Sequence, residues 1–289
     1  MNLLIQFLLR LCFGLAAGMA ITSSRQVTSG YFRNHLYVTL GLSTLASLVS
    51  YTVAPEVFWY AVAAAVASYV GSVCWLYETR FLGKMILIVV ALCCLNGGLR
   101  QQLRQYSIKW HSSPIMLNYL SQSVLEKRLA KDTFGLSQEM DRELRSFKSI
   151  SDYLTMSSVS SSGLLLGMTM AAMLLGHWYL NTPTMELAPL RRLILAMGAA
   201  VAFQILVSAL GLWGELEYAN ELSTQWWLFL LLRWSFGLVG VAVLTWMAWE
   251  TLKIPNTQSA TGILYVAVIG TFVGETMSLL LSAESLFPL

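Results

Sequence analysis

Residues 160–179 form an unbroken stretch of apolar and small side chains that contains no Asp, Glu, Lys, Arg or Pro. A helix rises 1.5 Å per residue, so roughly 20 such residues cross the hydrocarbon core of a bilayer. Further stretches of similar composition lie at residues 3–22, 36–53, 57–77, 81–99, 190–213, 226–249 and 260–282. The pattern therefore predicts an all-α protein, a polytopic transmembrane helical bundle of about eight spans.

The composition of the chain favours a lipid environment over an aqueous one. Of the 289 residues, 56% are hydrophobic and 11% are charged. Soluble domains usually carry about 25% charged residues. The formal net charge is only +3, which gives no indication of nucleic-acid binding. All four cysteines fall within apolar stretches, so we expect buried thiols and no disulfide framework. The partner that this composition predicts is the lipid bilayer.

The predicted spans fall into two sets of four, at 1–99 and 151–289, and a more polar segment at 100–150 separates them. This segment holds half of the 18 Lys and Arg residues of the chain. Within it, residues 116–129 place apolar side chains close to helical spacing. We expect one or two amphipathic helices here, lying on the membrane or packed over the bundle. A segment that binds other protein subunits and a solvated loop are the alternatives.

Small residues recur at three- or four-residue intervals on two of the predicted spans. Such spacing lets the backbones of membrane helices approach closely. One face consists of Gln6, Arg10, Gly14 and Gly18, and the other of Ser160, Gly163, Gly167 and Ala171. We expect both faces to point into the bundle.

Charged side chains are rare within the predicted spans, because each costs roughly 2.5–3.5 kcal/mol at the centre of a membrane helix. An even number of spans brings both chain ends out on one side, which we call the terminal side. Arg10, Arg233 and Glu275 each lie seven residues into a span from that side, and Gln204 lies nine residues in. These four residues are therefore predicted to share one layer at a depth of about 10 Å.

We expect the four residues to form a polar intramembrane cluster. In this hypothesis Glu275 pairs with Arg233, while Arg10 and Gln204 lie in or near the same network. One interpretation is a static ion pair that fixes helix packing. Another is a polar cavity that binds a quinone headgroup, an anion or a proton. A third is that the long arginine side chains reach the membrane interface.

Two histidines, His35 and His177, are predicted to lie together at the interface opposite the terminal side. Paired histidines at one level can ligate haem, so haem b joins quinone as a cofactor to consider. No carboxylate stands next to either histidine in the sequence. Interfacial histidines that hydrogen-bond to loop carbonyl groups are the preferred interpretation, and no metal site is predicted.

The sequence contains no nucleophile arrangement, Walker loop, GxGxxG pattern or zinc-ligand spacing. The one sizeable polar segment, 100–150, also lacks a catalytic signature. We therefore do not expect an enzyme that works on its own.

In layout alone, eight spans with polar groups near one surface resemble the quinol-interacting membrane anchors of bacterial oxidoreductases. No motif carries this resemblance, so it assigns no site residue. It implies a membrane subunit of a larger, respiratory complex in the bacterial inner (plasma) membrane, with other subunits docking through 100–150. A stand-alone transporter is the alternative, although no inverted repeat or mid-span helix break is detectable. A structural or assembly protein is the second alternative.

Overall fold

The computed structural model of the chain describes residues 1–111, 134–182, 185–218, 223–254, 256–285 and 287–289. Every regular element in these ranges is a helix, and eight helical segments are long and apolar enough to cross a membrane. The predicted all-α bundle of eight spans is confirmed. Its elements are α1 (Asn2–Ile21), α2 (Ser29–Val53), α3 (Pro55–Leu76), α4 (Arg80–His111), α6 (Phe134–Asn181), α7 (Ala188–Tyr218), α8 (Thr224–Leu232), the π-helix η1 (Arg233–Gly240), α9 (Val241–Thr251) and α10 (Thr257–Glu284).

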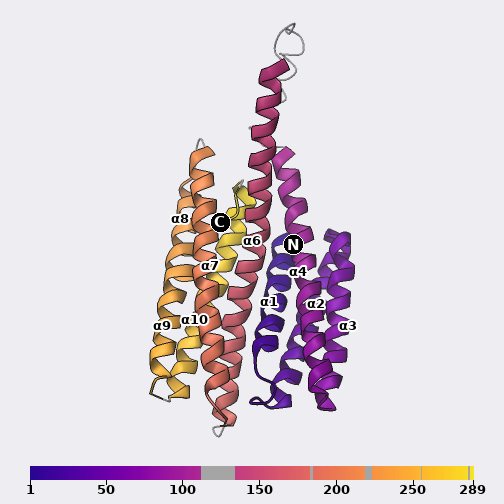
Figure 1. Cartoon of the computed structure of the whole chain (residues 1–289), viewed down its shortest axis with the longest axis vertical. Coiled ribbons are helices and arrows are strands. Elements are labelled where there is room, and N and C mark those ends of the chain that lie inside the picture. The colour runs from indigo at the N-terminus through magenta and orange to yellow at the C-terminus, as the bar shows by residue number, and fades with distance from the viewer. Residues whose placement is uncertain (112–133, 183–184, 219–222, 255, 286) are drawn as a thin grey trace.

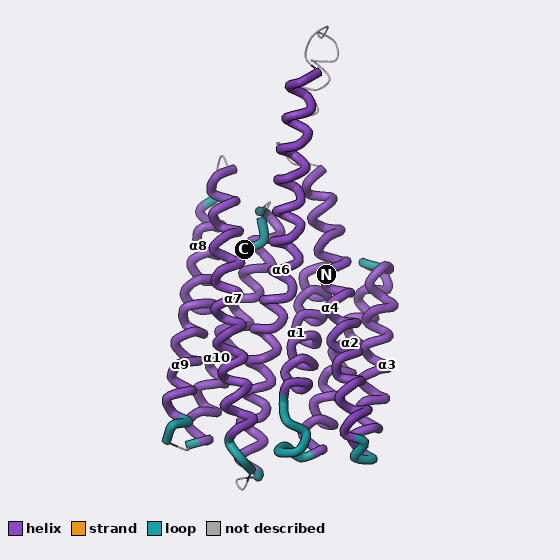
Figure 2. The backbone as a smooth tube through the Cα atoms, in the orientation of Figure 1, coloured by secondary structure: helices purple, strands orange, loops and turns teal. Residues whose placement is uncertain are grey.

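The helices stand side by side in two groups (Figure 1). α1 to α4 pack against one another, as do α6 to α10, and the two groups meet mainly where α1 lies against α6. α8, η1 and α9 follow one another without a gap and form the seventh span. Both chain ends lie at the same end of the bundle, as an even number of spans requires. The described loops lie at the two ends of the bundle (Figure 2).

Local sequence signals explain where several helices begin and end. Pro55 occupies the first turn of α3, where its missing N–H group is not needed, and so separates α2 from α3. Glu78 adopts a left-handed conformation, with φ of 57°, in the turn between α3 and α4. The side chains of Ser223 and Asn256 accept hydrogen bonds from the first turns of α8 and α10. These capping hydrogen bonds define where the helices of the last two spans begin.

Glycine allows α1 and α6 to touch backbone to backbone. A Cβ atom added at Gly14 would lie 1.9 Å from the carbonyl oxygen of Gly163, and one at Gly167 would lie 2.0 Å from the carbonyl carbon of Gly14. One turn further along, Gly18 faces Ala171. The two small-residue faces read from the sequence therefore pack against each other at the centre of the molecule.

The described parts of the 100–150 segment extend the neighbouring spans. The apolar stretch ends at Leu99, but α4 continues to His111, because no Pro or Gly interrupts residues 99–111. α6 begins at Phe134 and has 48 residues, so it rises well above the bundle at the terminal side (Figure 1). The expected amphipathic stretch at 116–129 lies outside the described residues.

Candidate functional site

The guanidinium group of Arg10 gathers polar side chains from three other helices. Arg10, on α1, is only 3% exposed. Its Nη1 lies 2.6 Å from Oε1 of Glu275 on α10 and donates to Oγ of Ser162 on α6 at 2.9 Å. Its Nη2 donates to Oε1 of Gln102 on α4 at 3.4 Å. Because Glu275 is equally buried, this is a salt bridge shielded from water.

The salt bridge corrects the expected pairing of Glu275 with Arg233. Glu275 binds Arg10 although 265 positions separate the two in the chain. α10 lies beside α1 at this level, where the rings of Phe7 and Phe272 pack edge to face with centroids 5.1 Å apart. The side chain of Arg233 is hydrogen-bonded to α7 instead. The predicted pair was wrong because depth along a helix does not reveal which neighbour a side chain faces.

A second set of contacts joins Arg233 to the same network. Nη2 of Arg233 donates to Oγ of Ser208 on α7 at 3.5 Å, and Nε2 of Gln204 donates to this hydroxyl at 3.2 Å. Ser161 on α6 donates to the amide oxygen of Gln204. Ser161 and Ser162 are adjacent, so the contacts of Arg233 and those of Arg10 meet on α6. We call this set the charged layer: Arg10, Gln102, Ser161, Ser162, Gln204, Ser208, Arg233 and Glu275.

Arg233 is the first residue of the π-helix η1, and it is only 2% exposed. Such wide helical turns are rare and often occur at functional sites. Further along η1, a Cβ atom added at Gly237 would lie 2.5 Å from Cα of Gly274 on α10. This close approach places the backbone of η1 directly against α10 beside Glu275.

The positive charges of the layer are only partly balanced by its own contacts. Arg233 is close enough to interact electrostatically with Glu275 and Arg10, but no carboxylate of a described residue lies within 4 Å of it. The Nε atoms of Arg10 and Arg233 are both buried and have no hydrogen-bond partner in the described part of the chain. The layer therefore has unused donors and can bind a group that supplies acceptor atoms or negative charge.

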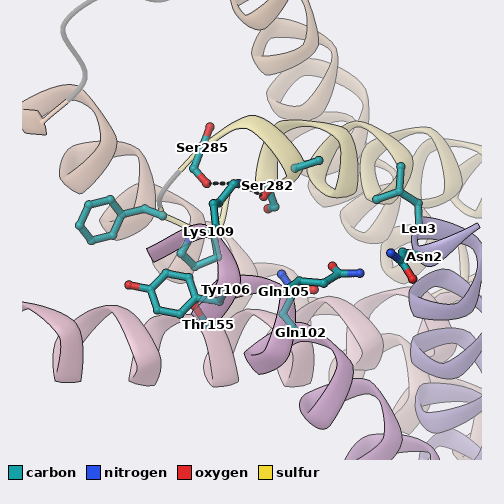
Figure 3. Close-up of a pocket in the computed structure, with 12 residues that line it drawn as sticks. Asn2, Leu3, Gln102, Gln105, Tyr106, Lys109, Thr155, Ser282 and Ser285 are labelled. Atoms are coloured by element: carbon teal, nitrogen blue, oxygen red, sulfur yellow. Dashed lines mark hydrogen bonds between the residues drawn. The ribbon is translucent and has the colours of Figure 1, made fainter. Parts of the chain in front are cut away.

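A polar cavity of about 270 Å³ lies between the charged layer and the terminal side. Figure 3 shows it enclosed by the first residues of α1, the last turns of α4, α6 and the end of α10. Its walls carry amide, hydroxyl and ammonium groups, including those of Gln105, Lys109 and Ser282. Gln102 belongs both to this wall and to the charged layer, and thus connects the terminal-side cavity to Arg10.

Residues 287–289 lie against the bundle beside this cavity. The backbone N–H of Phe287 donates to Oε2 of Glu215 on α7 at 2.9 Å. Nζ of Lys109 donates to the carbonyl oxygens of Ser282 and Ser285 at 2.7 and 2.5 Å. Ser278, one turn above Glu275, donates to the carbonyl oxygen of Leu289. These contacts hold the last residues over the charged layer and make them part of the cavity wall.

His35 and His177 have different neighbours. Nδ1 of His35, which is buried, lies 2.5 Å from the carbonyl oxygen of Tyr31 in its own helix. Nδ1 of His177, which is exposed, lies 3.1 Å from the hydroxyl of Tyr265 on α10. His35 contacts the ring of Trp178, the residue after His177, so the two imidazoles lie on different sides of α6. The structure does not bring them together around a common centre.

The sequence-based site prediction omitted four residues of the charged layer: Gln102, Ser161, Ser162 and Ser208. Gln102 follows the apolar stretch of the fourth span and was therefore assigned to the connecting segment. The serines are common in these spans, so residue type alone does not distinguish them. Their position does carry a signal, because Ser208 lies one helical turn from Gln204 and Ser162 precedes the glycine of the α1 contact.

Neither a ligand cluster nor a relative identifies the charged layer with a known site. In the ranges that the structure describes, no group of three or more His, Cys, Asp or Glu side chains is arranged to hold a metal ion. Comparison of the chain with models of known protein families, with curated proteins and with solved structures found no match.

Proposed function

We propose that the protein is a membrane subunit of a larger complex, and that it binds the polar headgroup of a small amphiphilic molecule in the terminal-side cavity. A quinone is the first ligand to test. The observation that carries this proposal is the position of Gln102, which lines the cavity and also accepts a hydrogen bond from Arg10.

The size and lining of the cavity support a headgroup as the ligand. At about 270 Å³ the cavity is slightly smaller than the roughly 300–1,000 Å³ of sites that enclose a whole drug-sized molecule. Donors such as the amides of Gln102 and Gln105 suit the carbonyl oxygens of a quinone ring. An apolar tail would remain among the helices or in lipid, where burial is favourable.

The length of α6 beyond the bundle supports a role within a complex. Of the described spans, α6 rises clearly past the others on the terminal side, and its 48 residues make it about 72 Å long. A bilayer core accounts for only about 30 Å of this length. We propose that the projecting segment docks other subunits, that the complex resides in a bacterial inner membrane, and that this subunit has no catalysis of its own.

Binding of short-tailed ubiquinone and menaquinone analogues to the purified protein in nanodiscs tests the ligand. Gln102→Leu should weaken binding by about tenfold or more, because it removes a polar wall and leaves Arg10 with one acceptor fewer. Asn96→Leu is the matched control, since Asn96 bonds to the carbonyl group of Leu92 in its own helix and does not line the cavity. Equal loss in both variants, or no saturable binding to the wild type, would contradict the proposal.

A stand-alone transporter is the second candidate, and one observation favours it. The seventh span departs from regular α-helix in η1, beside Arg233, whereas the sequence had shown no break in any span. Transporters often bind their substrates where membrane helices are irregular. Uptake of a labelled anion into proteoliposomes that contain only this protein would favour transport. Purification with quinone-reactive partner subunits, and no uptake, would favour the first proposal.

A further inference from the structure

We propose that Arg233 holds a small monovalent anion inside the bundle, at a site separate from the terminal-side cavity. The anion would lie beside the guanidinium group of Arg233 and the hydroxyl of Ser208, between η1 and α7. Chloride is the simplest ion of this class.

The positive charge of Arg233 has no close counter-charge among the described residues. Arg233 is 2% exposed, and in the described part of the chain no carboxylate lies within 4 Å of it. The nearby carboxylate, that of Glu275, is already bound to Arg10 at 2.6 Å. A buried lysine in this situation could release its proton, but a guanidinium group stays charged in proteins. A neutral water molecule would satisfy a donor without balancing the charge, whereas an anion does both.

The hydrogen-bonding capacity of Arg233 is largely unused. Its Nη2 lies at the long distance of 3.5 Å from Oγ of Ser208, and its Nε has no partner in the described ranges. Ser208 already receives a hydrogen bond from Gln204, which leaves its own hydroxyl hydrogen available to an acceptor. Arg233 and Ser208 therefore present donors from two helices to the same region.

η1 touches α10 so closely that a Cβ atom at Gly237 would lie 2.5 Å from Cα of Gly274, and a Cβ atom at Gly270 would lie 3.0 Å from the carbonyl oxygen of Phe236. This packing, on the turn after Arg233, closes the α10 side of η1 to an organic anion and leaves the α7 side, where Ser208 lies, for the ion. The π-helical geometry at Arg233 is a separate sign of a functional position, because π-turns often occur at such sites.

The test compares chloride with gluconate, a much larger organic anion, at constant ionic strength in nanodiscs of zwitterionic lipid. Chloride should raise the Tm of the wild-type protein saturably, by about 2–4 °C, because it binds the folded state alone. Arg233→Gln should abolish this shift. The matched control, Arg192→Gln, removes an exposed arginine from α7 at the opposite end of the bundle and should keep it.

Direct binding of radiolabelled chloride covers the case in which Arg233→Gln does not fold. Ser208→Ala keeps the charge of Arg233 and should weaken chloride binding several-fold, while Gln105→Leu should leave it unchanged, because Gln105 lines the terminal-side cavity and is not part of the charged layer. A wild-type protein without a chloride-specific response would overturn the anion site, and so would an equal response in Arg233→Gln. Either result leaves the quinone experiment unaffected.

Discussion

Two helix interfaces in this protein are built alike, and each has a buried arginine beside it. Gly14 packs against α6 next to Arg10, and Gly237 packs against α10 next to Arg233. The first interface joins two regular α-helices, and Arg10 has a carboxylate partner at 2.6 Å. The second involves a π-helix, and Arg233 has no such partner among the described residues. Close packing at a glycine therefore lies beside a paired arginine, Arg10, in one interface and beside an unpaired arginine, Arg233, in the other.

The difference separates two roles for an intramembrane charge. Arg10 and Glu275 stabilise each other, so their pair can fix how α1 and α10 pack without any ligand. Arg233 carries a desolvation cost that its contact with Ser208 does not offset. A buried donor that remains unsatisfied in a folded protein calls for an explanation, and a bound ion is one of the usual ones.

The largest effect should come from breaking the balanced pair. Glu275→Gln or Arg10→Gln should each lower the free energy of unfolding by about 3–5 kcal/mol, because each leaves one buried charge unpaired. The double variant should lose clearly less than the sum. Unfolding in mixed detergent micelles measures all three, and simple additivity would disprove the pairing. A cycle of Glu275→Gln with Arg233→Gln should show weaker coupling, since those groups are further apart.

A smaller effect should follow from adding one methyl group to the α1–α6 contact. Gly14→Ala should cost about 1–3 kcal/mol or more, because its Cβ meets the backbone of Gly163 at 1.9 Å and a backbone cannot rotate away. Gly41→Ala is the control, as nothing lies within 4 Å of its added Cβ. It should be neutral or stabilising by up to about 1 kcal/mol. Equal destabilisation of the two variants would mean that α1 and α6 do not touch as described.

Arg233→Gln should change stability little in chloride-free buffer, by less than about 1 kcal/mol and in either direction. Removing an unpaired buried charge relieves its desolvation cost and offsets the lost contact with Ser208. The unfolding measurement used for Arg10→Gln provides the comparison. If Arg233→Gln in this buffer destabilises the protein as strongly as Arg10→Gln, the two arginines are equally well balanced and the distinction between them disappears.

The smallest effect should come from the exposed ion pair of Arg104 with Glu56, at the rim of the bundle. Arg104→Gln should cost only about 0.2–0.5 kcal/mol, because water screens both groups. The cost should fall as salt is added. Unfolding at low and high ionic strength measures this. A cost that matches that of Glu275→Gln would show that burial does not govern the strength of these pairs.

Apolar length predicts the bundle, but residue counting does not show in which direction each charged side chain points. Contacts through three serines link Arg10, Gln204, Arg233 and Glu275, while their depth in a bilayer stays a prediction from the helical rise. The partner of Glu275 depends on which spans lie side by side. The first and last spans, α1 and α10, meet at the level of Glu275 although they lie at opposite ends of the sequence. Gln102 was missed because α4 continues beyond its apolar stretch. The π-helical turns at Arg233 have no recognisable signal in the sequence.

The great length of α6 has a mechanical consequence. Phe134 lies about 44 Å along the helix axis from the tightest contact of α6, at Gly163 and Gly167. A tilt of about 5° about that contact would carry the outer end through about 4 Å, yet would shift Ser161 and Ser162 by only about 0.3 Å. A force applied to the outer end in this way would move the opposite end, near Asn181, in the opposite direction and leave the ionised groups beside the contact almost in place.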